Sequence, residues 1–358
     1  MILSPARALA LAALLTGGPA AANDGFGGLA ATGLTFGRTD AVAMVDEDLF
    51  IGPDRIRVDY VFRNLTDQDV TGEVIFPLPP IGVWSLWEQM MNLPEGPPYP
   101  ENLLNFTVTV DGQPVTPRID RIAVIEPEWE ENRPLNEQYD TPGRDVTAEL
   151  ERYGLPLDLD PQAAMDRLLA LSPADRAAVT EAGLAQYFEA DTQNQIPEQA
   201  FPTWSVVLRY HWTQTFPAGA ELRVHHEYDH RPPGGIFYWT HPVTNETDWL
   251  QTYVDQFCID DGTSAAMARA LERKDPSSDE VYNYGTAFFM TYVLRTANSW
   301  AGPIGHFRLT LDKGDAANVI SLCAEGVKKT GPTTFVVEKT DYTPDRDLEI
   351  LLVVPISD

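Results

Sequence analysis

The sequence predicts a mainly β protein with two β-sandwich-like lobes and an acidic helical insert, which makes the chain α+β overall. Three observations support this prediction. Apolar and polar residues alternate in runs toward both ends of the chain, which is the two-residue period of half-buried strands. Turn-forming residues separate these runs. Residues 126–198 lack the alternation and are rich in Asp and Glu.

The first lobe is predicted as an N-terminal β-sandwich-like domain over residues 23–125. Residues 55–64 alternate apolar with mainly charged side chains, and residues 70–76 form a second such run. Asp111 and Gly112 follow a later run and predict a hairpin, because Asp-Gly favours the tight turns that match the twist of paired strands. These segments together predict a small antiparallel sandwich.

The acidic segment at 126–198 is predicted as a helical insert or linker. Asp160 and Ser172 each precede a proline, and this pair of residue types is typical of a helix start. Strand patterns return over residues 199–358, which predicts a C-terminal β-rich domain. Within that domain, residues 247–273 have a helical pattern. The charge run of the insert is interpreted as a solvated face.

The first 22 residues have the three-part layout of a secretory signal peptide. Arg7 gives a positive start, eight apolar residues follow from Ala8 to Leu15, and small residues end at Ala22. The apolar stretch is shorter than the roughly 20 residues that span a bilayer. We therefore expect cleavage near Ala22 and a periplasmic or secreted location. The alternative is a buried first helix.

The two cysteines of the chain are Cys258 and Cys323. In an oxidising compartment such a pair favours one disulfide bond. Closing a loop of this length would stabilise the fold by about 4 kcal/mol in the chain-entropy model. The alternative is two separate buried thiols. A catalytic thiol is disfavoured, because neither cysteine has a histidine nearby in the sequence.

The charge of the chain restricts its partners. Asp and Glu number 53 against 25 Lys and Arg, for a formal net charge of −28. Such a chain repels nucleic acid and anionic membrane surfaces. We expect no nucleic-acid partner and no membrane span, and a cationic partner or an envelope protein fits the charge better. The sequence leaves the oligomeric state open.

One motif raises an enzymatic alternative. His226, Glu227 and His230 match the His-Glu-x-x-His pattern of zinc proteases, which requires a helix so that both histidines reach one metal ion. Here apolar residues alternate from Leu222 to Tyr228, which predicts a strand. Residues four apart on a strand lie roughly 13 Å from each other, too far for one zinc. A zinc-dependent hydrolase at this motif is therefore the alternative function.

Other catalytic and cofactor signatures are missing from the sequence. There is no Gly-x-Ser-x-Gly elbow, no phosphate-binding loop and no dinucleotide-binding glycine pattern. Carboxylates are so numerous that their presence identifies no glycosidase pair. We therefore predict no catalytic residues and no cofactor.

An aromatic segment is the candidate for partner contact. Trp84, Trp87, Met90 and Met91 lie in the proline-rich stretch at 77–100. Aromatic and Met side chains are enriched where partners bind. The alternative is that this loop folds over its own sandwich and covers its open end.

Several short segments spread over the chain occur in a combination that is typical of a known family. They are residues 23–25, 34–36, 56–64, 76–79, 300–304, 320–323 and 343–348. Together these segments resemble the bacterial exported family called domain of unknown function 4424 (DUF4424). The resemblance covers almost the whole chain after the signal peptide and implies export in bacteria, to a periplasm. It implies no catalytic residues.

Residues 55–115 also resemble, more loosely, the vault and inter-alpha-trypsin type of β-module. The shared features are a Tyr-x-Phe-x-Asn strand, a strand that ends in Phe-Pro-Leu-Pro, and a later strand that leads into Asp-Gly. This resemblance implies a β-rich interaction module, as an analogy of fold. We therefore predict an exported, soluble and non-enzymatic binding or interaction module of the cell envelope.

Overall fold

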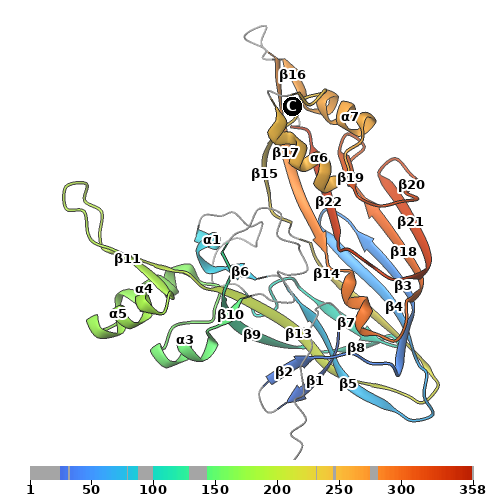
Figure 1. Ribbon diagram of the computed structural model, residues 1–358, viewed down its shortest axis with the longest axis horizontal. Coiled ribbons are helices and arrows are strands. Elements are labelled where there is room, and N and C mark those ends of the chain that lie inside the picture. The colour runs from blue at the N-terminus through green and yellow to red at the C-terminus, as the bar shows by residue number, and fades with distance from the viewer. Residues whose placement is uncertain are drawn as a thin grey trace, which may run out of the picture.

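The computed structural model describes residues 25–30, 33–78, 80–87, 100–128, 143–230, 232–244, 247–274 and 281–356. Strands predominate among these residues, and helices are fewer and shorter (Figure 1). The predicted mainly β, α+β fold class is thus confirmed. No helix in this part of the chain combines the length and the apolar composition needed to cross a membrane.

The first large sheet belongs to the N-terminal lobe. It contains β1 (Gly25–Ala30), β2 (Gly33–Phe36), β5 (Val70–Pro77), β6 (Ile81–Gly82), β9 (Arg118–Ile125), β10 (Arg144–Asp145) and β13 (Ser205–Phe216). The strand order is β10-β9-β13-β5-β1-β2, and β6 also pairs with β13. The long strand β13 is therefore the centre of this sheet.

The second large sheet passes through both lobes. It contains β3 (Val42–Ile51), β4 (Arg55–Asn64), β7 (Thr107–Val110), β8 (Gln113–Val115), β14 (Glu221–Asp229), β18 (Ile304–Asp312), β20 (Lys328–Lys329) and β21 (Thr334–Tyr342). The strand order is β20-β21-β18-β3-β4-β14-β7-β8. Strand β18 pairs in parallel with β3, and the other pairs are antiparallel.

A third sheet completes the C-terminal lobe. It contains β15 (Gly234–Tyr238), β16 (Glu272–Lys274), β17 (Val281–Tyr292), β19 (Val319–Leu322) and β22 (Leu348–Val354), in the order β15-β17-β22-β19 with β16 on β17. One face packs on the second sheet within the main hydrophobic core. The other face is covered by α6 (Gln251–Phe257) and α7 (Asp261–Leu271), which enclose a smaller second core.

The insert projects away from the sandwich (Figure 1). It contains α3 (Thr147–Tyr153), α4 (Pro161–Leu169), α5 (Pro173–Glu181) and a hairpin of β11 (Ala185–Phe188) and β12 (Gln199–Pro202). The two predicted helix starts are confirmed. Asp160 accepts a hydrogen bond from the backbone N–H of Ala163 at 3.0 Å, and Ser172 accepts one from Asp175 at 3.2 Å. The hairpin was not predicted.

Strand pairing joins the predicted domain ranges of 23–125 and 199–358. Strands β13 and β14 pair with β5 and β4 and so complete the two sheets of the N-terminal lobe. Each of these strands thus pairs with a segment far away in the sequence. Alternation predicts a strand but does not identify its neighbour.

The helical segment predicted at 247–273 is interrupted. It begins with a 3₁₀ turn at Asp248–Leu250, and α6 ends where Cys258 takes a left-handed conformation with φ of 50°. Asp260 then caps α7, because its carboxylate accepts the Thr263 N–H at 2.6 Å. The segment therefore forms two short helices, and its last residues belong to β16.

The two lobes meet at an aromatic cluster around Trp300, which follows the 3₁₀ helix at Arg295–Ser299. The Trp300 ring lies 4.4 Å from the Phe62 ring of β4 and 5.7 Å from the Phe216 ring of β13, between ring centroids. The Phe26 ring of β1 contacts its edge at 5.9 Å. One C-terminal side chain thus packs against strands of both N-terminal sheets.

We expect Trp300→Ala to lower the free energy of unfolding by about 3 to 5 kcal/mol, because it opens a cavity among three aromatic rings. Trp300 is only 1% exposed, whereas Trp249 is 52% exposed. The matched control Trp249→Ala should therefore cost less than about 1 kcal/mol. Denaturant unfolding of both variants measures the difference, and equal losses would contradict this view of the core.

Candidate functional site

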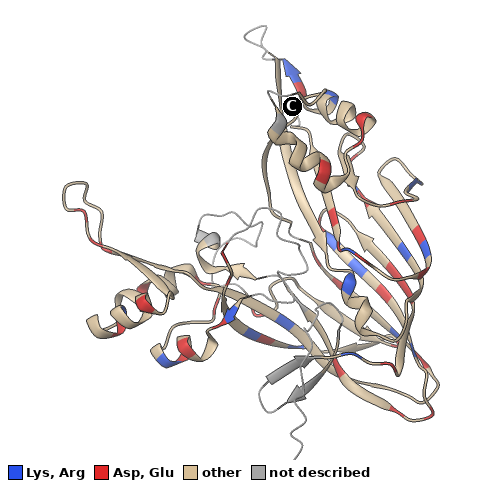
Figure 2. Cartoon of the chain, viewed as in Figure 1, with Lys and Arg blue, Asp and Glu red and all other residues tan. Residues whose placement is uncertain are grey.

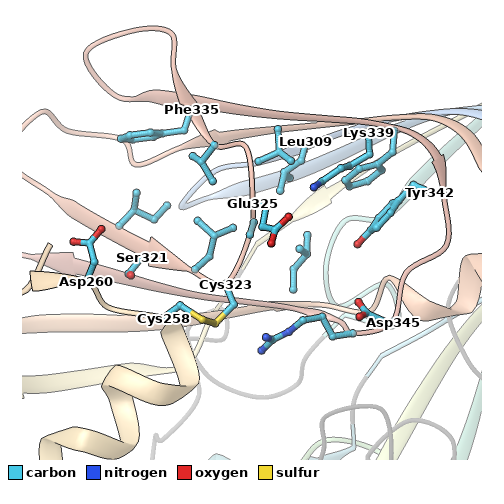
Figure 3. Close-up of a pocket in the computed structure, with 18 of the residues that line it drawn as sticks. Cys258, Asp260, Leu309, Ser321, Cys323, Glu325, Phe335, Lys339, Tyr342 and Asp345 are labelled. Atoms are coloured by element: carbon cyan, nitrogen blue, oxygen red, sulfur yellow. A yellow bond between two sulfur atoms is a disulfide. The ribbon is translucent and has the colours of Figure 1, made fainter. Parts of the chain in front are cut away.

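A groove of about 820 Å³ lies between the second and third sheets of the C-terminal lobe (Figure 3). Strands β18 and β21 form one wall, and β19 with the start of β22 forms the other. Leu309, Phe335 and Lys339 extend from the first wall in Figure 3, and Ser321 and Cys323 lie in the opposite wall. The loop at 323–327 connects β19 to β20 along one side of the groove.

Apolar side chains line the interior of this groove. Residues facing each other across β18 and β21 share one face of the sheet, because side chains alternate between faces. Phe307 lies opposite Lys339, and Leu309 lies opposite Val337. Further apolar lining residues are Ile320 and Leu322 of β19, Phe335 of β21 and Leu348 of β22.

The charged side chains of the lining form its rim, because they are exposed or, for Lys339, half-buried. Lys339 and Arg346 contribute the positive charges, and Asp260, Glu325 and Asp345 contribute the negative ones. Arg346 also forms an ion pair with Glu349 at 3.5 Å. The rim therefore offers both hydrogen-bond donors and carboxylate acceptors beside an apolar interior.

Two rim groups have pKa values shifted from their ordinary range. Burial of Tyr342, whose ring packs on Phe307 at 5.2 Å, raises the pKa of its hydroxyl, and the nearby charges of Asp345 and Glu47 raise it further. The hydroxyl is thus a hydrogen-bond donor at neutral pH. The backbone N–H of Thr263 lowers the pKa of Asp260, so that its carboxylate stays ionised as a helix cap.

A disulfide bond forms part of the groove wall. Cys258 and Cys323 are bonded, with their Cα atoms 5.0 Å apart, and both line the groove. The bond joins the end of α6 to the end of β19. Ser321 supports the same contact, because its hydroxyl donates a hydrogen bond to the Phe257 carbonyl at 3.0 Å. The helical layer is therefore fixed to the strand that lines the groove.

Comparison with known families identifies the chain. A family model described as domain of unknown function (DUF4424) matches residues 22–351. The chain belongs to the DUF4424 family. No curated protein matches it.

One solved structure with some similarity comes from Legionella pneumophila subsp. pneumophila str. Philadelphia 1, where it is described as a candidate nutrient binding protein. The match has a TM-score of 0.38 and 14% sequence identity, over 88% of the DUF4424 chain and 68% of the other. This similarity is too low to support an inference about fold or function.

The His-Glu-x-x-His motif of this DUF4424 protein lies on a strand. His226 is in β14, between Val58 of β4 and Val108 of β7, and it is fully buried. Aromatic rings surround it at 5.1 to 5.5 Å between centroids: they belong to Phe106, Trp212 and Tyr60. This histidine therefore belongs to the hydrophobic core of the sandwich.

The zinc-hydrolase alternative requires a helix at this motif, and the structure has strand β14 there instead. Glu227 forms an exposed ion pair with Arg55 at 3.1 Å, and His230 follows the strand and donates its Nδ1–H to the Gly52 carbonyl at 2.7 Å. On a strand these side chains cannot converge on one metal ion. Across the residues that the structure describes, no three His, Cys, Asp or Glu side chains form a metal-binding group.

The candidate contact segment is described only in part. Met90 and Met91 lie outside the described residues, and of α1 (Val83–Trp87) the Trp87 side chain does too. The Trp84 ring is half-buried and packs edge-on against Phe201 of β12, with 4.2 Å between centroids. Trp84 thus contacts the insert of its own chain, and a partner contact through the other three residues stays a prediction.

Sequence reasoning missed the groove residues other than the two cysteines. A signal was present at 334–340, within the predicted C-terminal β-rich domain, where Phe335, Val337 and Lys339 follow one another at every second position and so share one face of a strand. A charged residue at the end of an apolar strand face indicates the solvent-exposed rim of a site. The partner strands that complete the groove were not identifiable.

Burial lowers the pKa of His226 to about 3, against an ordinary value of 6.5. The unfolded chain therefore binds one more proton than the folded chain between these two pH values, so the free energy of unfolding falls as the pH falls below 6.5. From pH 7 to about pH 4.5 we expect His226 to account for a loss of about 2 to 3 kcal/mol.

In His226→Leu this part of the pH dependence should disappear, as measured by urea unfolding at each pH. The control Phe106→Leu disturbs the same core without removing a titratable group and should keep the wild-type pH dependence. An unchanged pH dependence in His226→Leu would show that His226 does not titrate as inferred.

Proposed function

We propose that this DUF4424 protein is an exported, non-enzymatic binding protein that holds a small amphipathic molecule in the groove between β19 and β21. The observation that carries the proposal is the contrast between buried apolar lining residues, such as Phe307 and Leu309, and the exposed charged residues of the rim. Its volume of about 820 Å³ lies within the roughly 300 to 1,000 Å³ of small-molecule sites. Sites of this kind bury the apolar body of a ligand and orient it with a few polar groups.

The rim supports a particular class of head group. Lys339 and Arg346 offer N–H donors, and Asp345 and Glu325 offer acceptors within the same lining. A head group that carries only negative or only positive charge would meet like charges there. A zwitterionic or hydroxylated head group fits both kinds of partner, with its apolar body among Phe307, Leu309 and the residues opposite them.

The groove residues support binding more than catalysis. No histidine lines the described groove. The Ser321 hydroxyl donates its hydrogen bond to a backbone carbonyl, and the Asp260 carboxylate caps α7. A nucleophile paired with a general base is the arrangement that acyl transfer needs, and these side chains do not provide it.

We expect Nile red, an uncharged apolar dye, to bind the wild-type protein at about one molecule per chain with a rise in fluorescence. Dodecylphosphocholine, a zwitterionic amphiphile, should displace it below its micelle concentration. In Leu322→Trp the larger ring fills the groove, so we expect the dye affinity to fall by about tenfold or more, which is at least about 1.4 kcal/mol.

The matched control is Leu65→Trp, at an exposed turn before β5, and it should bind the dye as the wild type does. Circular dichroism checks that both variants are folded. Equal dye affinity in Leu322→Trp and wild type would place the ligand elsewhere and contradict the proposal.

Three observations support the exported location within this proposal. The first 22 residues have the layout of a secretory signal, and the family match begins at residue 22. The disulfide bond between Cys258 and Cys323 fits an oxidising compartment, since such bonds persist outside the cytoplasm. A periplasm is the compartment that the family resemblance implies.

When the full chain is expressed in a Gram-negative host, we expect the periplasmic fraction to contain a protein whose measured mass matches a chain that begins at Asn23. Ala22→Arg should yield an uncleaved precursor, because the peptidase requires a small residue there. Ala13→Leu keeps the apolar core and should be processed normally. Wild-type protein that retains Met1 and stays in the cytoplasm would refute the export proposal.

A further inference from the structure

Lys339 brings an uncompensated positive charge into the wall of the groove. It lies on β21 directly opposite Phe307 of β18, and its half-buried side chain lines the groove (Figure 3). Within the described part of the chain, its ammonium group forms no ion pair and no hydrogen bond. Removing an ammonium group from water is unfavourable unless a carboxylate or a carbonyl oxygen replaces the lost water.

The other buried or half-buried Lys and Arg side chains that the structure describes all have partners. Acidic residues outnumber basic ones by 53 to 25 and are spread over both lobes and the insert (Figure 2), so a carboxylate is often close. Carboxylates pair with Arg121, Arg176, Arg295 and Arg308, backbone carbonyls accept from Lys313, and Arg209 and Arg273 also have interaction partners. Lys339 is the exception in this group.

The second cation of the lining does not share this property. Arg346 is exposed and forms an ion pair with Glu349 at 3.5 Å. Its charge is therefore partly compensated within the chain. Lys339 remains the group in the groove whose counter-charge a ligand would supply.

The hydroxyl of Tyr342 adds a second donor beside Lys339. Strand residues three apart normally point to opposite faces, but Asp341 takes a left-handed conformation with φ of 48°, and Tyr342 lines the same groove. Its ring packs on Phe307, the residue opposite Lys339, with 5.2 Å between centroids. Burial raises the pKa of the hydroxyl, which stays protonated at neutral pH and forms no hydrogen bond within the described residues. An ammonium group and an O–H donor thus lie next to one ring, and both lack an acceptor.

We propose that the amphipathic ligand of the groove is a zwitterion whose carboxylate or phosphate group binds the Lys339 ammonium and the Tyr342 hydroxyl. This inference rests on the proposed binding function and adds the charge and the orientation of the ligand. A charge-assisted hydrogen bond to the acid group gives the ammonium the acceptor that it lacks. An uncharged, hydroxylated head group would leave Lys339 without a counter-charge.

The acidic residues of the lining determine where the cationic group of the zwitterion lies. Asp345 and Glu325 are exposed, and within the described residues neither forms an ion pair. The charge of Asp345 acts on the Tyr342 hydroxyl, so these two groups are close. A purely anionic head group at Lys339 would be repelled by Asp345, whereas the cationic group of a zwitterion is attracted to it.

Competition between amphiphiles with the same dodecyl tail tests this assignment. N-dodecyl-N,N-dimethylglycine, a betaine, carries a carboxylate and a quaternary ammonium group, and dodecyltrimethylammonium lacks the carboxylate. Loss of Nile red fluorescence measures the binding of each compound below its micelle concentration. We expect wild-type protein to bind the betaine at least about tenfold more tightly than dodecyltrimethylammonium. Dodecylphosphocholine in place of the betaine shows which of the two acid groups is preferred.

Three variants assign the preference to its residues. Lys339→Met keeps the apolar part of the side chain and should bind Nile red like the wild type, but it should lose the preference for the betaine. Tyr342→Phe should weaken betaine binding by about fivefold, the effect of one hydrogen bond. The matched control Lys328→Met makes the same change of charge at an exposed lysine of β20 outside the lining and should keep the preference. Circular dichroism checks that each variant is folded.

Three outcomes would overturn this inference. They are equal binding of the betaine and of dodecyltrimethylammonium to the wild type, a preference that survives Lys339→Met, and tightest binding of dodecanoate, which is purely anionic. In each of these cases Nile red still binds, so the groove remains a binding site. Wild-type protein that binds no Nile red would instead refute the binding function itself, and this inference with it.

Discussion

The parallel pairing of β18 with β3 is the constraint on which the C-terminal lobe depends. Residues 306–311 of β18 lie beside residues 46–51 of β3 and continue the N-terminal sheet. The register of β3 shifts between Met44 and Asp46, and a Cβ atom on Gly305 would lie only 2.7 Å from the Val45 carbonyl oxygen. Only glycine therefore allows β18 to approach the irregular part of β3 this closely.

The groove follows from this pairing. Once β18 lies beside β3, its residues Phe307 and Leu309 face the third sheet, and β21 extends the same wall with Val337 and Lys339. The opposite wall is held by different contacts, through β22, β19 and the disulfide bond. A site between two sheets is thus set by packing in the whole lobe, and no single segment of the sequence contains it.

The sequence was most informative where one strand has one solvated face. The β4 range of Arg55–Asn64 agrees with the alternation of its residues. The same alternation predicted a strand at His226, although a literal motif suggested a helix. Strand β3 was missed because Asp46, Glu47 and Asp48 interrupt its apolar pattern, and the second of these is buried. The groove was missed because it depends on pairing between distant segments.

The disulfide bond connects the proposed location of the protein to its proposed function. The helical layer of α6 and α7 covers a small core of its own, separate from the main core of the two large sheets. Cys258, at the end of α6, is bonded to Cys323, and both side chains line the groove. In a reducing compartment this layer would be held to β19 by packing of the small core and by hydrogen bonds such as that of Ser321 alone. An oxidising compartment adds a covalent link at the wall of the groove, and for that reason we expect ligand binding to depend on export.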